Sequence, residues 1–163
     1  MKRKIVRATL LMISLATACL GLAPAVQAAE HCSNAKAAGE WGLILTGTLI
    51  LPTGPVPAAA TASGTFDAKG NIVSATEARN VGGSFANETL TGSWTVNPDC
   101  TGTLTVDAYG NGQLVRTSVL AIVFVDDLRK VLMVQESLTL PDGTTIPVVI
   151  TADGNKLFRE DGH

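Results

Sequence analysis

A chain of 163 residues, of which 46% are hydrophobic and 16% charged, is long enough to bury one core and too short for several large domains. Its 12 Lys and Arg stand against 14 Asp and Glu. Apart from the first few residues and the pair Arg129-Lys130, the basic side chains are scattered. The sequence therefore lacks the clustered positive charge of a nucleic-acid-binding surface, and we expect no nucleic-acid partner.

The first 28 residues have the pattern of a secretory signal peptide. The basic start MKRK precedes an apolar stretch at 5–23, and small residues lead up to a cleavage position after Ala28. A membrane anchor is the alternative, but the stretch is short, Pro24 and Gln27 interrupt it, and no stop-transfer pattern follows. The pattern therefore predicts export to the periplasm or the outside, without a stable transmembrane anchor.

Cys19 raises the question of a lipid anchor within this leader. It follows the small residues ATA, which resemble part of a lipobox. The first position of a lipobox normally carries Leu, Val or Ile, so lipid anchoring at Cys19 is not expected. Cleavage after Ala28 removes Cys19 and four basic residues, and it leaves an acidic chain of about 135 residues, a usual length for one domain.

Residues 29–39 form a polar, Ala-rich lead-in with room for one helical turn at most, and residues 40–163 predict a single all-β domain. From Glu40 onward, short runs of apolar residues and Thr are cut by Gly, Asp, Asn or Pro, and no run has a convincing helical period. The eight expected strands lie at 40–51, 60–66, 71–81, 88–96, 101–109, 113–125, 130–140 and 145–152.

The connections between these strands are short, which predicts that consecutive strands are antiparallel neighbours. The longest loop is expected at 52–57, because its prolines lack the N–H donors that a central strand needs. Another turn is expected at Asp153-Gly154-Asn155. A meander of eight antiparallel strands closes most simply into an up-and-down, calycin-like barrel, which leaves no exposed edge.

Two of the expected strands repeat one pattern on either side of the turn at 97–100. The sequence is TGSWTV at 91–96 and TGTLTV at 101–106, and a weaker copy, TGTL, occurs at 46–49. Thr and Ser occupy one face of each strand and larger apolar residues the other, as in a half-buried antiparallel sheet. The early Gly in each run fits the strong coiling of a barrel corner.

Two cysteines, Cys32 and Cys100, remain after removal of the leader. An even number in an exported chain favours a disulfide, which would fasten the lead-in to the turn that contains Cys100. Two free thiols are the alternative. A zinc site is less favoured, because His31 and His163 are the only histidines and such sites usually need three or four ligands. We expect neither a metal nor another cofactor.

The segment TGSWTVNPDCTGTLTV, a Cys soon after the leader, and a following strand with Gly beside an aromatic together resemble a group of small secreted bacterial proteins of unassigned function. Their hallmark is a "tGtYtvnpDCtGt" segment, in which Trp94 here takes the aromatic position. The resemblance covers most of the mature chain, and it implies export, a Cys32–Cys100 bridge and a barrel, but no established activity. In architecture alone, the expected barrel is similar to lipocalin-like and allene oxide cyclase-like barrels.

The familiar catalytic constellations are missing from the sequence. No histidine lies between His31 and His163, so the Ser-His-Asp and Cys-His arrangements cannot be built. Nucleotide-binding and zinc-protease motifs are missing too. An enzymatic function is therefore less favoured than a binding function.

Arg116 and Glu136 interrupt apolar strand faces, and each shares its face with leucines of its own strand. If both pointed inward, they would form the polar floor of a ligand cavity. Pairing across the turn at 126–130 would place Glu136 opposite Val119. A surface ion pair, or a bulge that turns Glu136 outward, is the favoured alternative, because 115–125 is apolar on both faces and does not fix which side is inside.

The aromatic residues are few and dispersed, which argues against a flat carbohydrate-binding face and favours a core position for Trp94. The small residues at 58–64 could leave room for one small ligand in an eight-stranded interior. The leading hypothesis is a secreted barrel that binds a small apolar molecule near Glu136, Arg116 and Trp94. A structural or surface-interaction protein of the cell envelope and a barrel cyclase or isomerase are the alternatives, and the oligomeric state stays open.

Overall fold

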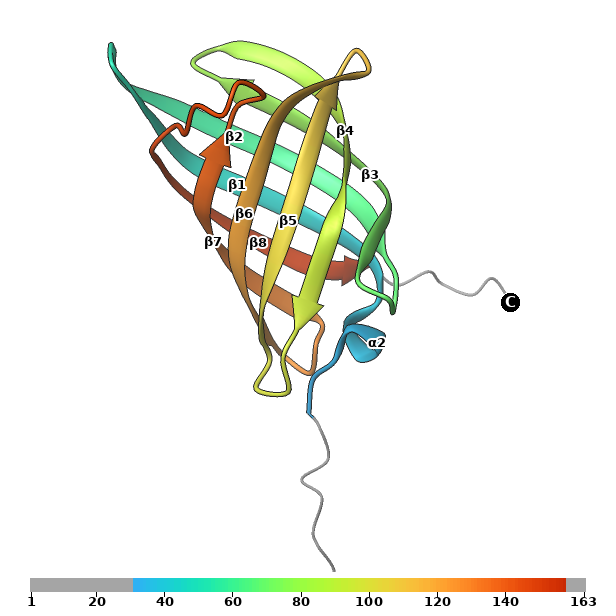
Figure 1. The fold of residues 1–163 in the computed structure, drawn as a ribbon. Helices are drawn as coiled ribbons and strands as arrows, with labels where there is room; N and C mark the ends of the chain where they lie inside the picture. Colours follow the sequence, from blue (N-terminus) through green and yellow to red (C-terminus); the bar gives the residue numbers. More distant parts are fainter. Residues whose placement is uncertain (1–30, 158–163) are drawn as a thin grey trace, which may run out of the picture.

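The computed structural model describes residues 31–157, which form one short helix and eight strands (Figure 1). The predicted signal peptide at 1–28, Cys19 and His163 lie outside these residues. Helix α2 spans Asn34–Ala37, so the lead-in holds the single helical turn that the sequence allows. Within residues 31–157, no helix is both long enough and apolar enough to cross a membrane.

The eight strands form a closed antiparallel barrel in chain order. Each strand pairs with the next, and β1 also pairs with β8, from Glu40 opposite Leu157 to Leu49 opposite Val148. The prediction of an all-β up-and-down barrel is confirmed. The strands are β1 Gly39–Leu51, β2 Gly54–Phe66, β3 Asn71–Val81, β4 Ser84–Val96, β5 Thr101–Gly110, β6 Gln113–Val125, β7 Lys130–Thr139 and β8 Val148–Leu157.

The proline-rich segment at 52–57, predicted to be a loop, is mostly the beginning of β2. Both Pro55 and Pro57 take part in the ladder with β1. The carbonyl oxygen of Pro57 accepts a hydrogen bond from the backbone N of Gly82, so Pro57 directs its own N and O away from β1. Regular pairing with β3 begins only at Ala58. The prediction was wrong because these prolines lie where β2 has a regular strand partner on one side only, and there Pro is tolerated.

A second correction concerns residues 153–155, which were predicted to form a turn but lie inside β8, opposite residues 42–44 of β1. A Cβ atom added at Gly154 would lie 2.5 Å from Leu43 Cδ2 and 2.7 Å from Val131 Cγ1. Gly154 is therefore small because neighbouring side chains need its space. A glycine of this kind reads as a turn signal in the sequence.

The glycine of each TG repeat lies where two neighbouring strands approach closely. A Cβ atom added at any of these glycines would lie 2.0 to 2.1 Å from a carbonyl oxygen of the adjacent strand. This close approach agrees with the coiling that the sequence predicts at the three positions. The glycines are Gly47, Gly92 and Gly102.

One end of the barrel is filled by four large side chains, called here the aromatic layer: Trp41, Phe66, Trp94 and Phe124. The ring of Trp94 contacts those of Phe66 and Phe124, with centroids 5.5 and 6.1 Å apart. Helix α2 and the β2–β3, β4–β5 and β6–β7 turns lie at this end (Figure 1). The aromatic layer therefore closes the barrel on the side of α2.

Helix α2 is attached to this end of the barrel by hydrogen bonds of its own Asn34 side chain and by one that Trp41 donates to its backbone. The side chain of Asn34 donates to Trp94 O at 3.2 Å and accepts from Val96 N at 2.7 Å, so it serves as a partner for the end of β4. Trp41 Nε1 donates to Ala37 O at 3.1 Å, and Ala37 itself is completely buried. These hydrogen bonds fix the helix against the end of β4 and against Trp41 of β1.

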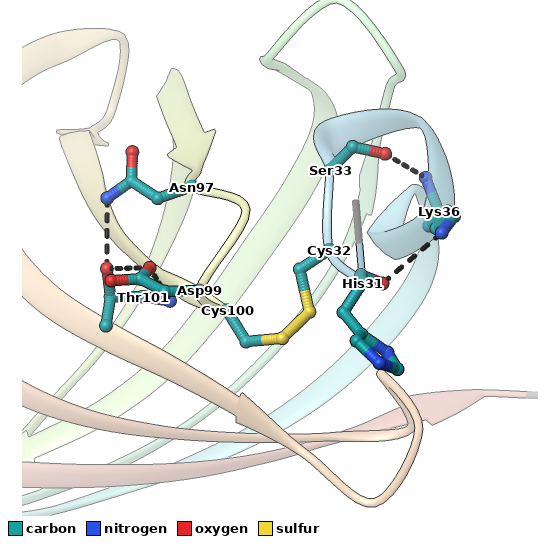
Figure 2. Close-up of a disulfide and its surroundings, with 8 residues drawn as sticks. All are labelled: His31, Cys32, Ser33, Lys36, Asn97, Asp99, Cys100 and Thr101. Atoms are coloured by element: carbon teal, nitrogen blue, oxygen red, sulfur yellow. Dashed lines mark hydrogen bonds between the residues drawn. A yellow bond between two sulfur atoms is a disulfide. The ribbon is translucent and has the colours of Figure 1, made fainter. Parts of the chain in front are cut away.

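The predicted disulfide between Cys32 and Cys100 is present (Figure 2). Cys32 precedes α2, Cys100 lies in the turn between β4 and β5, and their Cα atoms are 5.0 Å apart. In the same turn, the Asp99 carboxylate accepts hydrogen bonds from Thr101 N at 3.0 Å and from Thr101 Oγ1 at 2.7 Å. The disulfide therefore ties the helix segment to a turn that has its own internal bonding.

Replacement of Cys100 by Ser should lower the free energy of unfolding by about 4 kcal/mol in the chain-entropy description, because the bridge closes a separation of 68 residues. Urea unfolding of the oxidised protein, the reduced protein and the variant measures this loss. The reduced wild type should match the variant. Equal midpoints for the oxidised and reduced wild type would contradict the stabilising role.

Candidate functional site

Between the aromatic layer and the opposite end, the barrel interior contains a cavity of about 280 Å³ that is partly open to solvent. Most of its lining is aliphatic. Strand β2 contributes alanines, and its neighbour in the sheet, β1, contributes leucines. The volume is about twice the 150 Å³ of an engineered apolar cavity that holds benzene. Among the lining residues are Leu43, Leu45 and Leu49 of β1 and Ala58, Ala60 and Ala62 of β2.

Four charged side chains meet on one side of the interior and are called here the ion cluster: Glu77, Arg79, Glu88 and Arg116. Arg116 donates from Nη1 to Glu88 and from Nη2 to Glu77. Arg79 Nε donates to Glu88 Oε1 at 2.6 Å. Glu77 and Glu88 lie directly opposite each other in the β3–β4 ladder and are 6% and 4% exposed. Without the arginines these two buried carboxylates would repel each other.

Arg116 has to cross β5 to reach these carboxylates, because it starts on β6 and they lie on β3 and β4. Its partner in the β5–β6 ladder is Ala108, which is 1% exposed. Neighbouring strands lie about 4.8 Å apart, so the long arginine side chain has to extend over the inner face of β5. The small methyl group of Ala108 leaves that path free.

A second polar pair extends the cluster toward β7. Gln135 Nε2 donates to Ser118 Oγ and to Ser137 O, both at 3.0 Å. Gln135 and Ser118 are each 8% exposed, and both line the cavity. No donor among residues 31–157 is bonded to Gln135 Oε1, so this oxygen can accept a hydrogen bond from a molecule in the cavity.

The two carboxyl groups of the ion cluster have opposite pKa shifts. Burial raises the pKa of Glu77 above its ordinary value, and the charge and hydrogen bond of Arg116 only partly oppose this rise. Burial also pushes the pKa of Glu88 upward, but hydrogen bonds from Arg79 and Arg116 outweigh it, so the pKa of Glu88 lies below its ordinary value. Burial dominates at Glu77, which has one arginine hydrogen-bond partner, whereas two such partners outweigh burial at Glu88, so the pKa of Glu77 is the higher of the two.

Arg116 and Glu136, the two charged residues singled out from the sequence, lie on opposite sides of the barrel wall. Arg116 lines the cavity, whereas the side chain of Glu136 is exposed. Val119 pairs with Ser137 and Leu120 with Gln135, so Glu136 has no partner in the β6–β7 ladder. The inward interpretation of Glu136 is therefore corrected, and the alternative, a bulge that turns it outward, is the arrangement found.

Trp94 lies in the interior but at a different level from Arg116. It belongs to the aromatic layer and is 3% exposed, and its Nε1 has no hydrogen-bond partner among residues 31–157. Glu88 precedes it by six residues on the same face of β4, which places the two backbone positions about 20 Å apart. A void of about 20 Å³ beside Trp94 shares Leu43, Leu104 and Met133 with the lining of the main cavity.

Sequence reasoning missed Glu88 and Gln135 as site residues and did not connect Glu77 and Arg79 to Arg116. One signal was visible for Glu88, since it precedes Leu90 and Trp94 at alternate positions of one strand. The inward position of Gln135 was hidden, because the bulge at Glu136 reverses the alternation of β7 at that point.

The cavity therefore has two chemically different walls. The polar wall consists of the ion cluster together with Ser118 and Gln135, on β3, β4, β6 and β7. The opposite wall, from β1, β2 and β8, is aliphatic apart from Thr46, and apolar side chains of the other strands complete the lining. Within residues 31–157, no group of three or more His, Cys, Asp or Glu is placed to hold a metal ion. This arrangement is suited to hold and orient one small organic molecule.

Replacement of Ala108 by Leu should destabilise the protein by several kcal/mol, because the larger side chain would displace Arg116 and leave Glu77 and Glu88 without a shared partner. Ala59→Leu is a matched control, since Ala59 is exposed on β2. Urea unfolding of both variants measures the difference. Equal losses in the two variants would show that Arg116 does not depend on the space above Ala108.

The opposite pKa shifts of Glu77 and Glu88 predict opposite effects of pH on stability. The raised pKa of Glu77 means that the folded state binds more protons than the unfolded state. The contribution of Glu77 to stability therefore falls as pH rises from its pKa in the unfolded state to its pKa in the folded state. The lowered pKa of Glu88 gives a contribution that is lost as pH falls through its folded value.

In the wild type, the free energy of unfolding should fall as pH rises above the ordinary pKa of a glutamate, and Glu77→Gln should remove this fall. Urea unfolding measured from acidic to neutral pH tests this expectation, with Glu136→Gln as the exposed control. A parallel pH profile for Glu77→Gln and the wild type would contradict the raised pKa.

Comparisons of the chain with protein-family models, with curated proteins and with solved structures find no significant match. The resemblance of the 91–106 segment to small secreted bacterial proteins is accordingly not supported by a family assignment. Function therefore has to be argued from the cavity and its two walls.

Proposed function

We propose that this barrel binds a small, mainly apolar molecule in its interior cavity. The observation that carries the proposal is the interior cavity of about 280 Å³. Well-packed interiors leave few voids larger than a water molecule, and an empty apolar cavity destabilises a protein in proportion to its volume. A ligand that fills the cavity would restore the missing contacts.

The two walls divide the work of binding in this proposal. Contacts with Leu43, Leu45 and the alanines of β2 supply most of the affinity, because they remove apolar surface from water. The polar wall supplies orientation through a few directed hydrogen bonds. Arg116 acts mainly within the ion cluster, since two of its guanidinium nitrogens are bonded to glutamates.

Ala60→Phe should weaken binding of a hydrophobic fluorescent probe by about tenfold or more, because the ring would occupy the cavity. Thr61→Phe is the matched control, because Thr61 is exposed on the same strand and does not line the cavity. Glu136→Gln should also bind like the wild type. Fluorescence titration of the mature wild type and the three variants measures the four affinities. If no probe binds the folded wild type saturably, the structural or surface-interaction alternative replaces this proposal.

A second candidate is a proton-transfer enzyme of the cyclase or isomerase type. The observation in its favour is a buried carboxyl group, Glu77, whose pKa is raised beside a cavity and an arginine. Glu77 would move the proton, and a guanidinium group would stabilise the negative charge that develops on the substrate. Exchange of α-protons for deuterium in 2-decanone, followed by NMR, tests it: exchange in the wild type that is lost in Glu77→Gln supports it, and no exchange excludes it for this class.

A further inference from the structure

We infer that the cavity selects uncharged ligands: small apolar molecules that carry one hydroxyl or carbonyl group. This inference rests on the proposed function and specifies the chemical class of its ligand. Benzene, with six non-hydrogen atoms, occupies a cavity of about 150 Å³, so a cavity of about 280 Å³ accommodates on the order of a dozen. The charge preference follows from the pairing inside the ion cluster.

The ion cluster is electrically balanced without a ligand. Two arginines face two glutamates, and each of the four charges has a partner within the cluster. The charged residues in the cavity lining are Glu77, Arg79 and Arg116, and all belong to this cluster. The cavity therefore presents no unpaired charge that could attract an ion of either sign.

A charged ligand would disturb this balance in either direction. A carboxylate would compete with Glu77 and Glu88 for the same arginines and add a third negative charge to a buried site. An ammonium group would add a positive charge beside Arg79 and Arg116. An uncompensated charge in an apolar interior is strongly unfavourable, so both ions bind more weakly than a neutral molecule of the same shape.

Neutral hydrogen-bonding groups, by contrast, find partners on the polar wall. Arg79 uses its Nε for Glu88 and keeps its terminal nitrogens as donors for a carbonyl oxygen. Gln135 uses its Nε2 within the protein and keeps Oε1 as an acceptor for a hydroxyl group. Both residues line the cavity, so one small ligand has a donor and an acceptor within its reach.

Calorimetric titration of the mature protein with four ten-carbon probes tests the inference: 1-decanol, 2-decanone, decanoate and decylammonium. The two neutral probes should bind the wild type about tenfold or more tightly than the two ions. Glu77→Gln should then raise the affinity for decanoate about tenfold, because it leaves the cluster with a net positive charge. Arg79→Gln should raise the affinity for decylammonium for the opposite reason.

The control is Glu136→Gln, which makes the same chemical change on the outside of the barrel and should leave the order of the four affinities unaltered. Circular dichroism confirms that each variant is folded, and partly exposed Arg79 provides the test if Glu77→Gln does not fold. Decanoate or decylammonium binding the wild type as tightly as decanol would overturn the inference and leave the proposed function intact. Failure of all four probes would overturn both.

Discussion

The ladder between β1 and β8 is the constraint on which the rest of this structure depends. It gives every strand two neighbours, so no edge is left to pair with another chain. Closure also decides which face of each strand is inside. An eight-stranded barrel has an interior that side chains can just fill, or that can hold one small ligand, so the size of the inward residues decides between these outcomes.

The inward residues differ in size along the barrel axis, and this difference creates the cavity. On the side of α2, the aromatic layer fills the interior, and the disulfide and Asn34 hold the helix against it. Farther along, the inward residues of β2 are alanines and those of β1 are leucines. The aromatic layer fills one end of the barrel, and the smaller side chains beyond it leave the space of the cavity.

The ion cluster lies at the level of the cavity, and its four charges depend on one another. Taking four charges into the interior is costly, and the cost is offset only when every charge keeps its partner. Arg116 is the central member, because it donates hydrogen bonds to both Glu77 and Glu88. These two carboxylates are paired in the β3–β4 ladder and would otherwise repel each other. The balance also shapes the binding proposal, since a neutral cluster contributes orientation and selectivity while apolar contacts contribute affinity.

The sequence by itself determined the strand content, the meander and the disulfide, because these depend on local signals. Residues alternate between faces with a period of two, short turns make consecutive strands neighbours, and an even number of cysteines favours a bridge. The same local signals gave wrong predictions at the prolines of β2 and at Gly154. Whether a strand tolerates Pro or Gly at a position depends on the neighbouring strands and side chains, which the local sequence does not show.

Only the tertiary structure decided the composition of the site. The one-residue bulge at Glu136 reverses the two faces of β7, so it moves this carboxylate outward and Gln135 inward. Glu77, Glu88 and Arg116 come from three strands and meet because Ala108 lets the arginine pass over a fourth. Such contacts depend on the register across several strands and on the closure of the barrel, and neither is encoded in the alternation of any single strand.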